Sequence, residues 1–365
     1  MKIFFVMHMP PPVHGSSMMG GYIKESKLIN ESFECSYLNL STSSKVNGIG
    51  RWSLLKLYRY VRILFSVIIH LVFLRTDVCY ITIAAKGMAF YKDAFIAILF
   101  KVFRKKIIYH FHNKGVSLGS QKLMNRCLYR CIFRNSYAIL LSSYLYGDVR
   151  TYFPENRVFV CPNGVPLLTE RVDYFREKNK EVSLLFLSNM IESKGVMILL
   201  DTCKKLNERG LLFKCCFVGG EGDVDSTIFD RRVNELGLQS CVKYLGGKYG
   251  SEKTFEFLNA DIFVFPTFYH YECFPLVLLE AMQFELPVVS TYEGGIVDIV
   301  DDGVTGFLVE QRNVDDLTDK VGLLITDHQL RKNMGSAGYS KYLSEYTLSV
   351  FEDRLRKIFL QVYNM

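Results

Sequence analysis

Short apolar runs alternate along the chain with longer segments in which apolar residues recur every three or four positions. The short runs predict buried strands, and the longer segments predict helices. In the first half, the strand candidates are Lys2–Met7, Cys35–Leu40, Val78–Ile83, Lys106–His110, Tyr137–Ser142 and Arg157–Cys161. The helix candidates are a helix that ends near Asn30, then Ser53–Leu74, Phe90–Phe103 and Leu118–Arg134.

The alternation is interrupted at Pro162-Asn-Gly-Val-Pro166 and then begins again. We interpret the polar segment Thr169–Glu181 as a linker. The second set of strand candidates is Ser183–Leu187, Leu212–Val218, Val242–Leu245, Asp261–Phe265, Val288–Ser290 and Gly306–Val309. The helix candidates are Gly195–Arg209, Asp225–Leu236, Ser251–Asn259, a helix after Pro275, one around Val297, Asn313–Asp327, His328–Tyr342 and Leu348–Tyr363.

Strands separated by helices predict parallel sheets with right-handed crossovers. A chain of 365 residues is long enough for two domains of this kind. We therefore predict an α/β fold with two Rossmann-like doubly wound domains, residues 1–166 and 167–345, facing across a cleft. Residues 346–365 are predicted to form a helix that packs back toward the N-terminal domain. Sheets of this kind bind their ligands at the carboxyl ends of the strands.

Composition indicates a folded globular protein, since 49% of the residues are hydrophobic and 22% are charged. The net charge of +7 fits an anionic small ligand, an anionic membrane surface, or neither. Ten cysteines without a CxxC pair favour reduced thiols in the cytoplasm and argue against structural zinc. The run Ile63–Leu74 is shorter than the roughly 20 residues that span a bilayer, so it predicts a buried or interfacial helix.

Two carboxylates, Glu272 and Glu280, stand eight residues apart around the predicted start of a helix at Pro275. The free N–H groups of a first helical turn, with the helix dipole, can hold a diphosphate. The carboxylates can accept hydrogen bonds from sugar hydroxyls and from a ribose diol. Taken alone, the pair more simply fits a solvated loop glutamate and a partly paired helical one.

The sequence around this pair is Glu272-Cys-Phe-Pro-Leu-Val-Leu-Leu-Glu280-Ala, followed by Pro287-Val-Val289. This segment closely resembles the family 4 retaining glycosyltransferases of the GT-B fold. The likeness extends over most of the second half, through Pro162-Asn-Gly-Val165, Cys216-Phe-Val-Gly-Gly-Glu-Gly-Asp223, Glu293-Gly-Gly-Ile-Val-Asp-Ile-Val300 and Asp302-Gly-Val-Thr-Gly-Phe-Leu308.

The resemblance implies a role for each residue of the motif. Glu280 would bind the ribose of the nucleotide and Glu272 the donor sugar, with the backbone around Phe274, Leu276 and Val277 near sugar and phosphate. The loops that contain Gly219, Gly247 and Lys248 would lie against the nucleotide.

The segment Ser188–Gly195 corresponds to the diphosphate site of the family, and its Lys194 would stabilise charge on the departing diphosphate. The simpler alternative for Lys194 is a solvated charge at a helix start. Family members usually carry an arginine where this chain has Asn189, and a neutral amide cannot supply that charge. Lys248 and Lys114 are candidates to compensate.

In the first half, the resemblance places His112 near the donor sugar, and strand alternation puts His110 on the same face. A metal site is disfavoured because no third ligand is apparent. The loop after the first strand contains His14, Gly15 and Ser16, which form a candidate acceptor or phosphate loop or, equally, a simple turn.

By resemblance, the N-terminal domain binds the acceptor and the C-terminal domain binds the nucleotide sugar. The implied reaction is retaining transfer by front-face attack onto a glycan or lipid-linked oligosaccharide, in bacterial surface polysaccharide or lipopolysaccharide synthesis. We expect no metal, no cofactor and no nucleic-acid partner. The alternatives are a GT-B relative such as an epimerase or a phosphorylase, and a non-enzymatic, basic membrane-binding protein.

Two basic segments suggest attachment to the inner face of the plasma membrane. A helix with aromatic and aliphatic residues among its cations can lie on an anionic membrane, although an ordinary solvated face is an equal alternative. The cations of the first segment are Arg51, Lys56, Arg59, Arg62 and Arg75. Those of the second are Lys122, Arg126, Arg130 and Arg134, whose four-residue spacing places them on one helix face.

Overall fold

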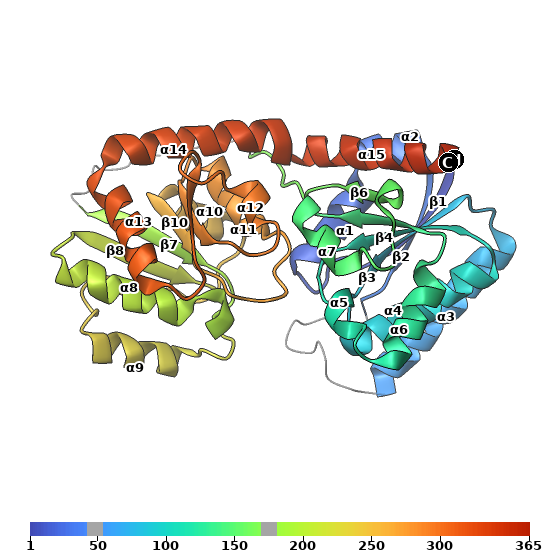
Figure 1. The fold of residues 1–365 in the computed structure, drawn as a ribbon, viewed down its shortest axis with the longest axis horizontal. Coiled ribbons are helices and arrows are strands. Elements are labelled where there is room, and N and C mark those ends of the chain that lie inside the picture. Colours follow the sequence, from blue (N-terminus) through green and yellow to red (C-terminus); the bar gives the residue numbers. More distant parts are fainter. Residues whose placement is uncertain (42–53, 169–180) are drawn as a thin grey trace. The chain divides into compact units, whose positions relative to one another are not determined.

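The computed structural model describes residues 1–41, 54–168 and 181–365. The predicted linker, except Glu181, lies outside these ranges, as do Arg51 and Ser53. The chain forms two compact units, residues 1–164 together with 348–365, and residues 165–347 (Figure 1). These divisions lie two residues from the boundaries that the sequence suggested.

The first unit contains a six-stranded parallel sheet in the order β2-β1-β3-β4-β5-β6. Ile3 of β1 pairs with Cys35 on one side and Val78 on the other, so the sheet grows in both directions from β1. Ligands of doubly wound sheets bind at such a switch point. The strands are β1 (Lys2–Met7), β2 (Glu34–Asn39), β3 (Val78–Ile83), β4 (Lys106–Phe111), β5 (Tyr137–Leu140) and β6 (Val158–Val160).

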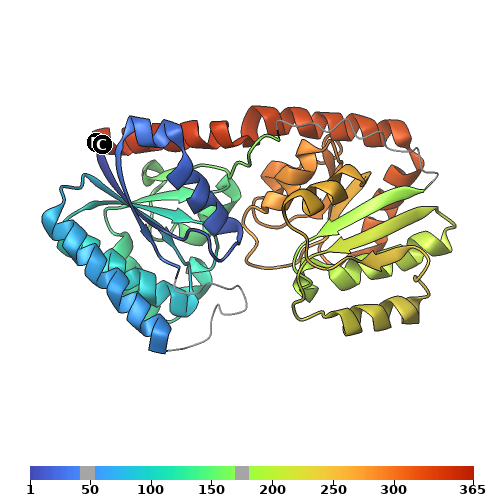
Figure 2. The ribbon, with the colours of Figure 1, turned by 180° about the vertical axis from the view of Figure 1, so that it is seen from behind.

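Helices cover both faces of this sheet, which explains why strands such as β3 are buried along their whole length. On one face α3 contacts α4 and α4 contacts α6, while on the other α15 contacts α2 (Figures 1 and 2). Phe359 of α15 stacks edge-on against Phe5 and Tyr80, so α15 belongs to this unit. The helices are α1 (Gly15–Glu25), α2 (Lys27–Ser32), α3 (Leu54–Phe73), α4 (Gly87–Val102), α5 (Val116–Gly119), α6 (Leu123–Phe133), α7 (Tyr146–Val149) and α15 (Leu348–Asn364).

The second unit contains a parallel sheet in the order β12-β11-β10-β7-β8-β9, and its switch point lies between β7 and β10. The strands are β7 (Val182–Leu187), β8 (Phe213–Val218), β9 (Val242–Tyr244), β10 (Ile262–Phe265), β11 (Val288–Thr291) and β12 (Gly306–Val309). The helices are α8 (Val196–Glu208), α9 (Ser226–Leu236), α10 (Gly250–Leu258), α11 (Leu276–Gln283), α12 (Ile296–Ile299), α13 (Val314–Thr326) and α14 (His328–Lys341).

The structure confirms the prediction of two doubly wound parallel α/β domains, and most elements lie within two or three residues of their predicted ends. Two segments were wrongly predicted to form single continuous helices. The first is divided at Ser26, which is extended and whose side chain accepts a hydrogen bond from the Ile29 amide at 3.2 Å to cap α2. The second is divided between α5 and α6, around residues 120–122.

Candidate active site

The structure brings Lys194 and Glu272 together at the switch point of the second sheet. Lys194 ends the short 3-10 helix η4 (Glu192–Lys194) after β7, and Glu272 lies in the loop after β10. Their side chains form an ion pair and are 15% and 11% exposed. Because β7 and β10 are neighbours, two residues that are 78 positions apart in sequence share one edge of the sheet.

Close backbone packing fixes this pair. Gly195 has a φ of +94°, and a Cβ there would lie 2.3 Å from the Pro266 carbonyl oxygen, so the loops after β7 and β10 approach too closely for a side chain. The Phe268 amide donates to the Ser193 carbonyl at 2.8 Å and joins the same two loops. The Lys194 ammonium also lies 4.4 Å from the centre of the Tyr269 ring, a favourable cation–π geometry.

The Glu293-Gly-Gly motif supports Glu272 from the other side. Gly294 has a φ of +54°, and a Cβ there would lie 2.3 Å from the Glu272 carbonyl oxygen. The Gly295 amide donates to the Cys273 carbonyl at 2.7 Å. The loop after β11 therefore packs directly on the backbone that carries Glu272.

Glu280 lies on α11 and forms an ion pair with Lys253 of α10 at 2.6 Å. Sequence reasoning missed Lys253, because its contact depends on the packing of two helices. Pro275 is the residue before the helix, not its first residue, so α11 begins at Leu276. Leu276 and Val277 thus occupy the first turn, and Phe274 is buried beside it.

Lys248 has a carboxylate partner of its own, since its ammonium lies 3.0 Å from Glu256. To contact a diphosphate, it would have to exchange this partner. Lys114, the other proposed substitute for the missing arginine, belongs to the first unit. The compensating role of Lys248 and Lys114 stays a prediction.

Asn189 is exposed at the end of β7. Beside it, Gly219 must be glycine, because a Cβ there would lie 1.7 Å from the Ser188 carbonyl oxygen. A cation that the sequence interpretation missed lies near the same loops: the Arg312 guanidinium is 4.3 Å from the centre of the Phe268 ring. Phe268 is the residue whose amide bonds to Ser193, next to Lys194.

In the first unit, His112 directly follows β4, and its ring centre is 4.2 Å from that of His110. His110 is fully buried, and its Nδ1 lies 2.6 Å from the Tyr80 hydroxyl. The Nε2 atoms of both histidines are buried without a hydrogen-bond partner. Burial, with His8 and His14 nearby, lowers the pKa of His112 to about 3, so its imidazole is neutral near pH 7.

His14, Gly15 and Ser16 form the start of α1. His14 is the N-cap: its Nδ1 accepts from the Ser17 amide at 3.4 Å and lies 3.2 Å from the Ser16 hydroxyl. A Cβ on Gly15 would meet no atom within 4 Å, so the protein's own packing does not require glycine there. Burial also lowers the pKa of the neighbouring His8, to about 4.

Among residues 1–41, 54–168 and 181–365, no three or more His, Cys, Asp or Glu side chains are arranged to hold a metal ion. Over the same ranges, no helix combines the length and the apolar character needed to cross a bilayer.

The sequence of the second unit matches the model of a known family. The chain matches the model of glycosyl transferases group 1 over residues 170–341, which include Lys194, Glu272 and Glu280.

Curated relatives match about half of the chain. The capsular polysaccharide biosynthesis glycosyltransferase CapM of Staphylococcus aureus is 26% identical over 219 residues, 56% of each chain. The D-inositol 3-phosphate glycosyltransferase of Corynebacterium jeikeium is 30% identical over 179 residues, 48% of this chain and 42% of the relative. The chain thus spans about half the length of these relatives.

Solved structures resemble the whole chain. Sucrose-phosphate synthase from Thermosynechococcus elongatus has a TM-score of 0.75 at 15% identity and covers 100% of this chain and 99% of its own. Anabaena HepE in complex with UDP and glucose has a TM-score of 0.73 at 17% identity and covers 99% of this chain and 100% of its own. WaaG, a glycosyltransferase involved in lipopolysaccharide biosynthesis, has a TM-score of 0.68 at 16% identity and covers 98% of this chain and 99% of its own. At these identities the likeness shows the GT-B fold class.

Proposed function

We propose that the protein transfers a sugar, with retention, from a nucleoside-diphosphate sugar to a glycan or lipid-linked oligosaccharide in bacterial surface polysaccharide synthesis. The observation that carries this proposal is the Lys194–Glu272 pair at the switch point of the family-matched unit. UDP and glucose in the HepE structure, and capsular polysaccharide as the product pathway of CapM, support the substrate class.

Each charged residue has a task in this reaction. Lys194 leaves Glu272 and neutralises the diphosphate, while the freed Glu272 carboxylate accepts hydrogen bonds from sugar hydroxyls. Glu280 exchanges Lys253 for the ribose diol in the same way. The ion pairs thus hold the carboxylates in place before the donor arrives.

In the transfer, the bond between the anomeric carbon and the diphosphate oxygen breaks, and a bond from that carbon to the acceptor oxygen forms on the same face. The acceptor hydroxyl proton passes to the departing phosphate oxygen. The protein contributes by positioning the reactants and stabilising charge. His112 enters this scheme as a neutral hydrogen-bonding group near the sugar. No metal or cofactor is part of it.

The test is transfer or slow hydrolysis with a panel of nucleotide sugars, using the purified full chain. Lys194→Met and Glu272→Gln should each lower kcat by about 10²–10³-fold, as expected for loss of a charge that acts in the transition state. Lys214→Met removes a comparable ion pair with Glu181 on the surface and should leave the rate unchanged. Wild-type rates in folded Lys194 and Glu272 variants would refute the assignment.

A further inference from the structure

The outward face of α3 is apolar, which is unusual for a helix on the surface of a domain. Within α3 only Ile63, Val67 and Leu71 are buried, at four-residue intervals, so a narrow stripe holds the helix against the sheet. The opposite side of a surface helix is normally polar. On α3 it consists mainly of exposed apolar side chains, among them Tyr58, Val61, Phe65, Ile69, Val72 and Phe73.

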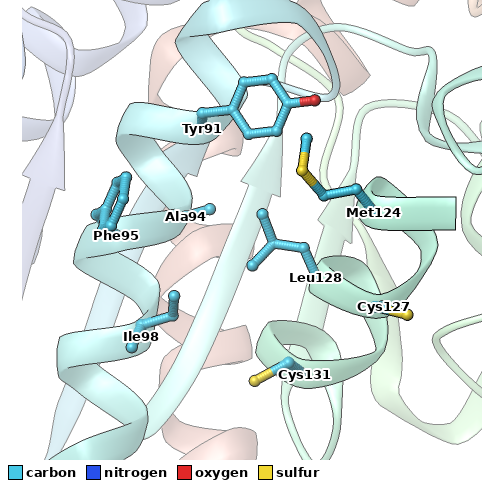
Figure 3. A pocket seen from close by; sticks show the side chains of 8 residues that line it. All are labelled: Tyr91, Ala94, Phe95, Ile98, Met124, Cys127, Leu128 and Cys131. Carbon is cyan, nitrogen blue, oxygen red and sulfur yellow. The ribbon is translucent and has the colours of Figure 1, made fainter. Parts of the chain in front are cut away.

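This surface continues onto the neighbouring helices. Tyr60 of α3 donates to the Lys92 carbonyl of α4 at 2.7 Å, and α4 packs against α6. Between α4 and α6 lies an open apolar hollow of about 460 Å³. In Figure 3, Ala94 and Ile98 of α4 face Met124 and Leu128 of α6 across it. We call the outer surface of these three helices the α3–α4–α6 face.

Positive charge is concentrated in the same part of the chain. Residues 54–134 contain 15 Lys and Arg but only two acidic residues, a net charge of +13. Both acids are used internally: Asp93 is buried and accepts from the Ala84 amide, and Asp77 accepts from the Lys2 amide. The exposed part of α3, α4 and α6 therefore carries cations without acids.

The charge pattern selects the partner. Among the exposed cations of the face are Arg62 on α3 and Arg126 and Arg130 on α6. A protein partner of mixed charge would be matched by acids as well as bases, and a nucleic acid would be matched mainly by cations and hydrogen-bonding groups, not by a broad surface of aliphatic side chains. A bilayer with anionic headgroups matches both features, since it accepts apolar side chains and attracts Lys and Arg.

We propose that the α3–α4–α6 face docks on an anionic phospholipid bilayer. α3 lies in the membrane plane with Phe65 and Ile69 at the boundary between headgroups and acyl chains, while Arg62, Arg126 and Arg130 contact phosphate. Docking is independent of the donor site. Only its consequence, access to a lipid-linked acceptor at the membrane surface, rests on the function proposed above.

Flotation of the full chain with vesicles tests this. Wild type should bind vesicles of phosphatidylcholine and phosphatidylglycerol (3:1) at 0.1 M salt, at least tenfold more strongly than pure phosphatidylcholine. Phe65→Glu/Ile69→Glu should lose binding at least tenfold, and Arg62→Gln/Arg130→Gln should weaken it and flatten its salt dependence. Val304→Glu and Lys332→Gln alter exposed residues of the second unit and should bind like wild type.

Nucleotide binding measured on the same samples separates docking from donor recognition, because the α3 variants should retain it. A second readout needs no substitution: Cys127 and Cys131 are exposed on α6, and a polarity-sensitive dye on them should shift to the blue on anionic vesicles. Three results would each overturn docking: equal binding by the Phe65→Glu/Ile69→Glu variant, no dye response in nucleotide-binding wild type, or binding of RNA but not of vesicles.

Discussion

The two units of this protein share a doubly wound architecture and differ in how they distribute charge. Residues 181–347 contain 25 acidic and 15 basic residues, whereas residues 54–134 contain two acidic and 15 basic residues. In the second unit, helices α8, α9 and α13 carry opposite charges in contact, with ion pairs Lys205–Asp315, Arg209–Asp319 and Arg232–Asp201. In the first unit, the exposed part of α3, α4 and α6 has cations and apolar side chains without acids.

Similar helical layers of the two units therefore offer different surfaces to the solvent. Mixed surface charges contribute little stability but keep a helix face in water, which suits α8, α9 and α13. The α3–α4–α6 face lacks this mixture. The two sheet edges proposed to bind ligands differ as well, because Lys194 and Glu272 are a charged pair, whereas burial keeps His8 and His112 neutral. An anion is thus expected in the second unit and neutral hydroxyl groups in the first.

Among substitutions that test the difference between the two units, Gly294→Ala should have the largest effect on stability and rate. Its Cβ would lie 2.3 Å from the Glu272 carbonyl oxygen at a left-handed φ, so the loop that carries Glu272 must move. We expect a loss of about 2–3 kcal/mol in the free energy of unfolding and at least a tenfold fall in kcat.

The matched control is Gly237→Ala, where φ is +68° and a Cβ would meet no atom within 4 Å. It should cost only about 1 kcal/mol, the ordinary penalty of a left-handed alanine, and should preserve kcat. Chemical denaturation and initial rates measure both quantities. If the two variants behaved alike, the close approach of Gly294 to the Glu272 backbone would not matter for the site.

A smaller effect is expected from Arg312→Gln. We propose that Arg312 supplies the second positive charge that Asn189 cannot, because its guanidinium stacks on Phe268 beside the Ser193–Lys194 segment. The Kd for the preferred nucleoside diphosphate should rise about tenfold, equivalent to about 1.4 kcal/mol.

Lys320→Gln is the control for Arg312, since Lys320 also lies over an aromatic ring, Phe307, at 4.9 Å in the same unit. Isothermal titration calorimetry on both variants makes the comparison. An unchanged Kd in the Arg312 variant would leave Lys194 and the start of α11 as the diphosphate site and would exclude Arg312.

Local patterns were sufficient to predict much of the second unit. Lys194 and Glu272 follow strands and Glu280 lies in the next helix, positions that apolar runs, glycine and proline located. The roles of all three residues came from the resemblance of their motifs to a known family. Lys253 and Arg312 could not be found in this way, because their contacts depend on which strands and helices become neighbours.

The first unit was less predictable for a different reason. Its helices were recognised, but the net charge of +7 concealed a net charge of +13 over residues 54–134 and −10 over residues 181–347. Which side of α3 faces outward became clear only when Ile63, Val67 and Leu71 were placed against the sheet.

The smallest expected effect concerns pH and the neutral histidines of the first unit. Burial holds the pKa of His8 at about 4 and that of His112 at about 3, against about 6.5 in the unfolded chain. Below pH 6.5 the unfolded chain therefore binds more protons, and the histidines make the fold less stable as pH falls. Each contributes a slope of at most about 1.4 kcal/mol per pH unit, reduced by partial access to water.

Asp93 has the opposite effect and makes the fold more stable as pH falls. Burial raises its pKa to about 7, so between about pH 4 and 7 the folded state holds a proton that the unfolded chain has lost. Thermal unfolding between pH 5 and 7 should show a flatter fall toward acid for His8→Gln/His112→Gln than for wild type, and a steeper fall for Asp93→Asn. Parallel curves for all three proteins would mean that these groups are solvated, and the contrast between charged and neutral ligand-binding edges would then be lost.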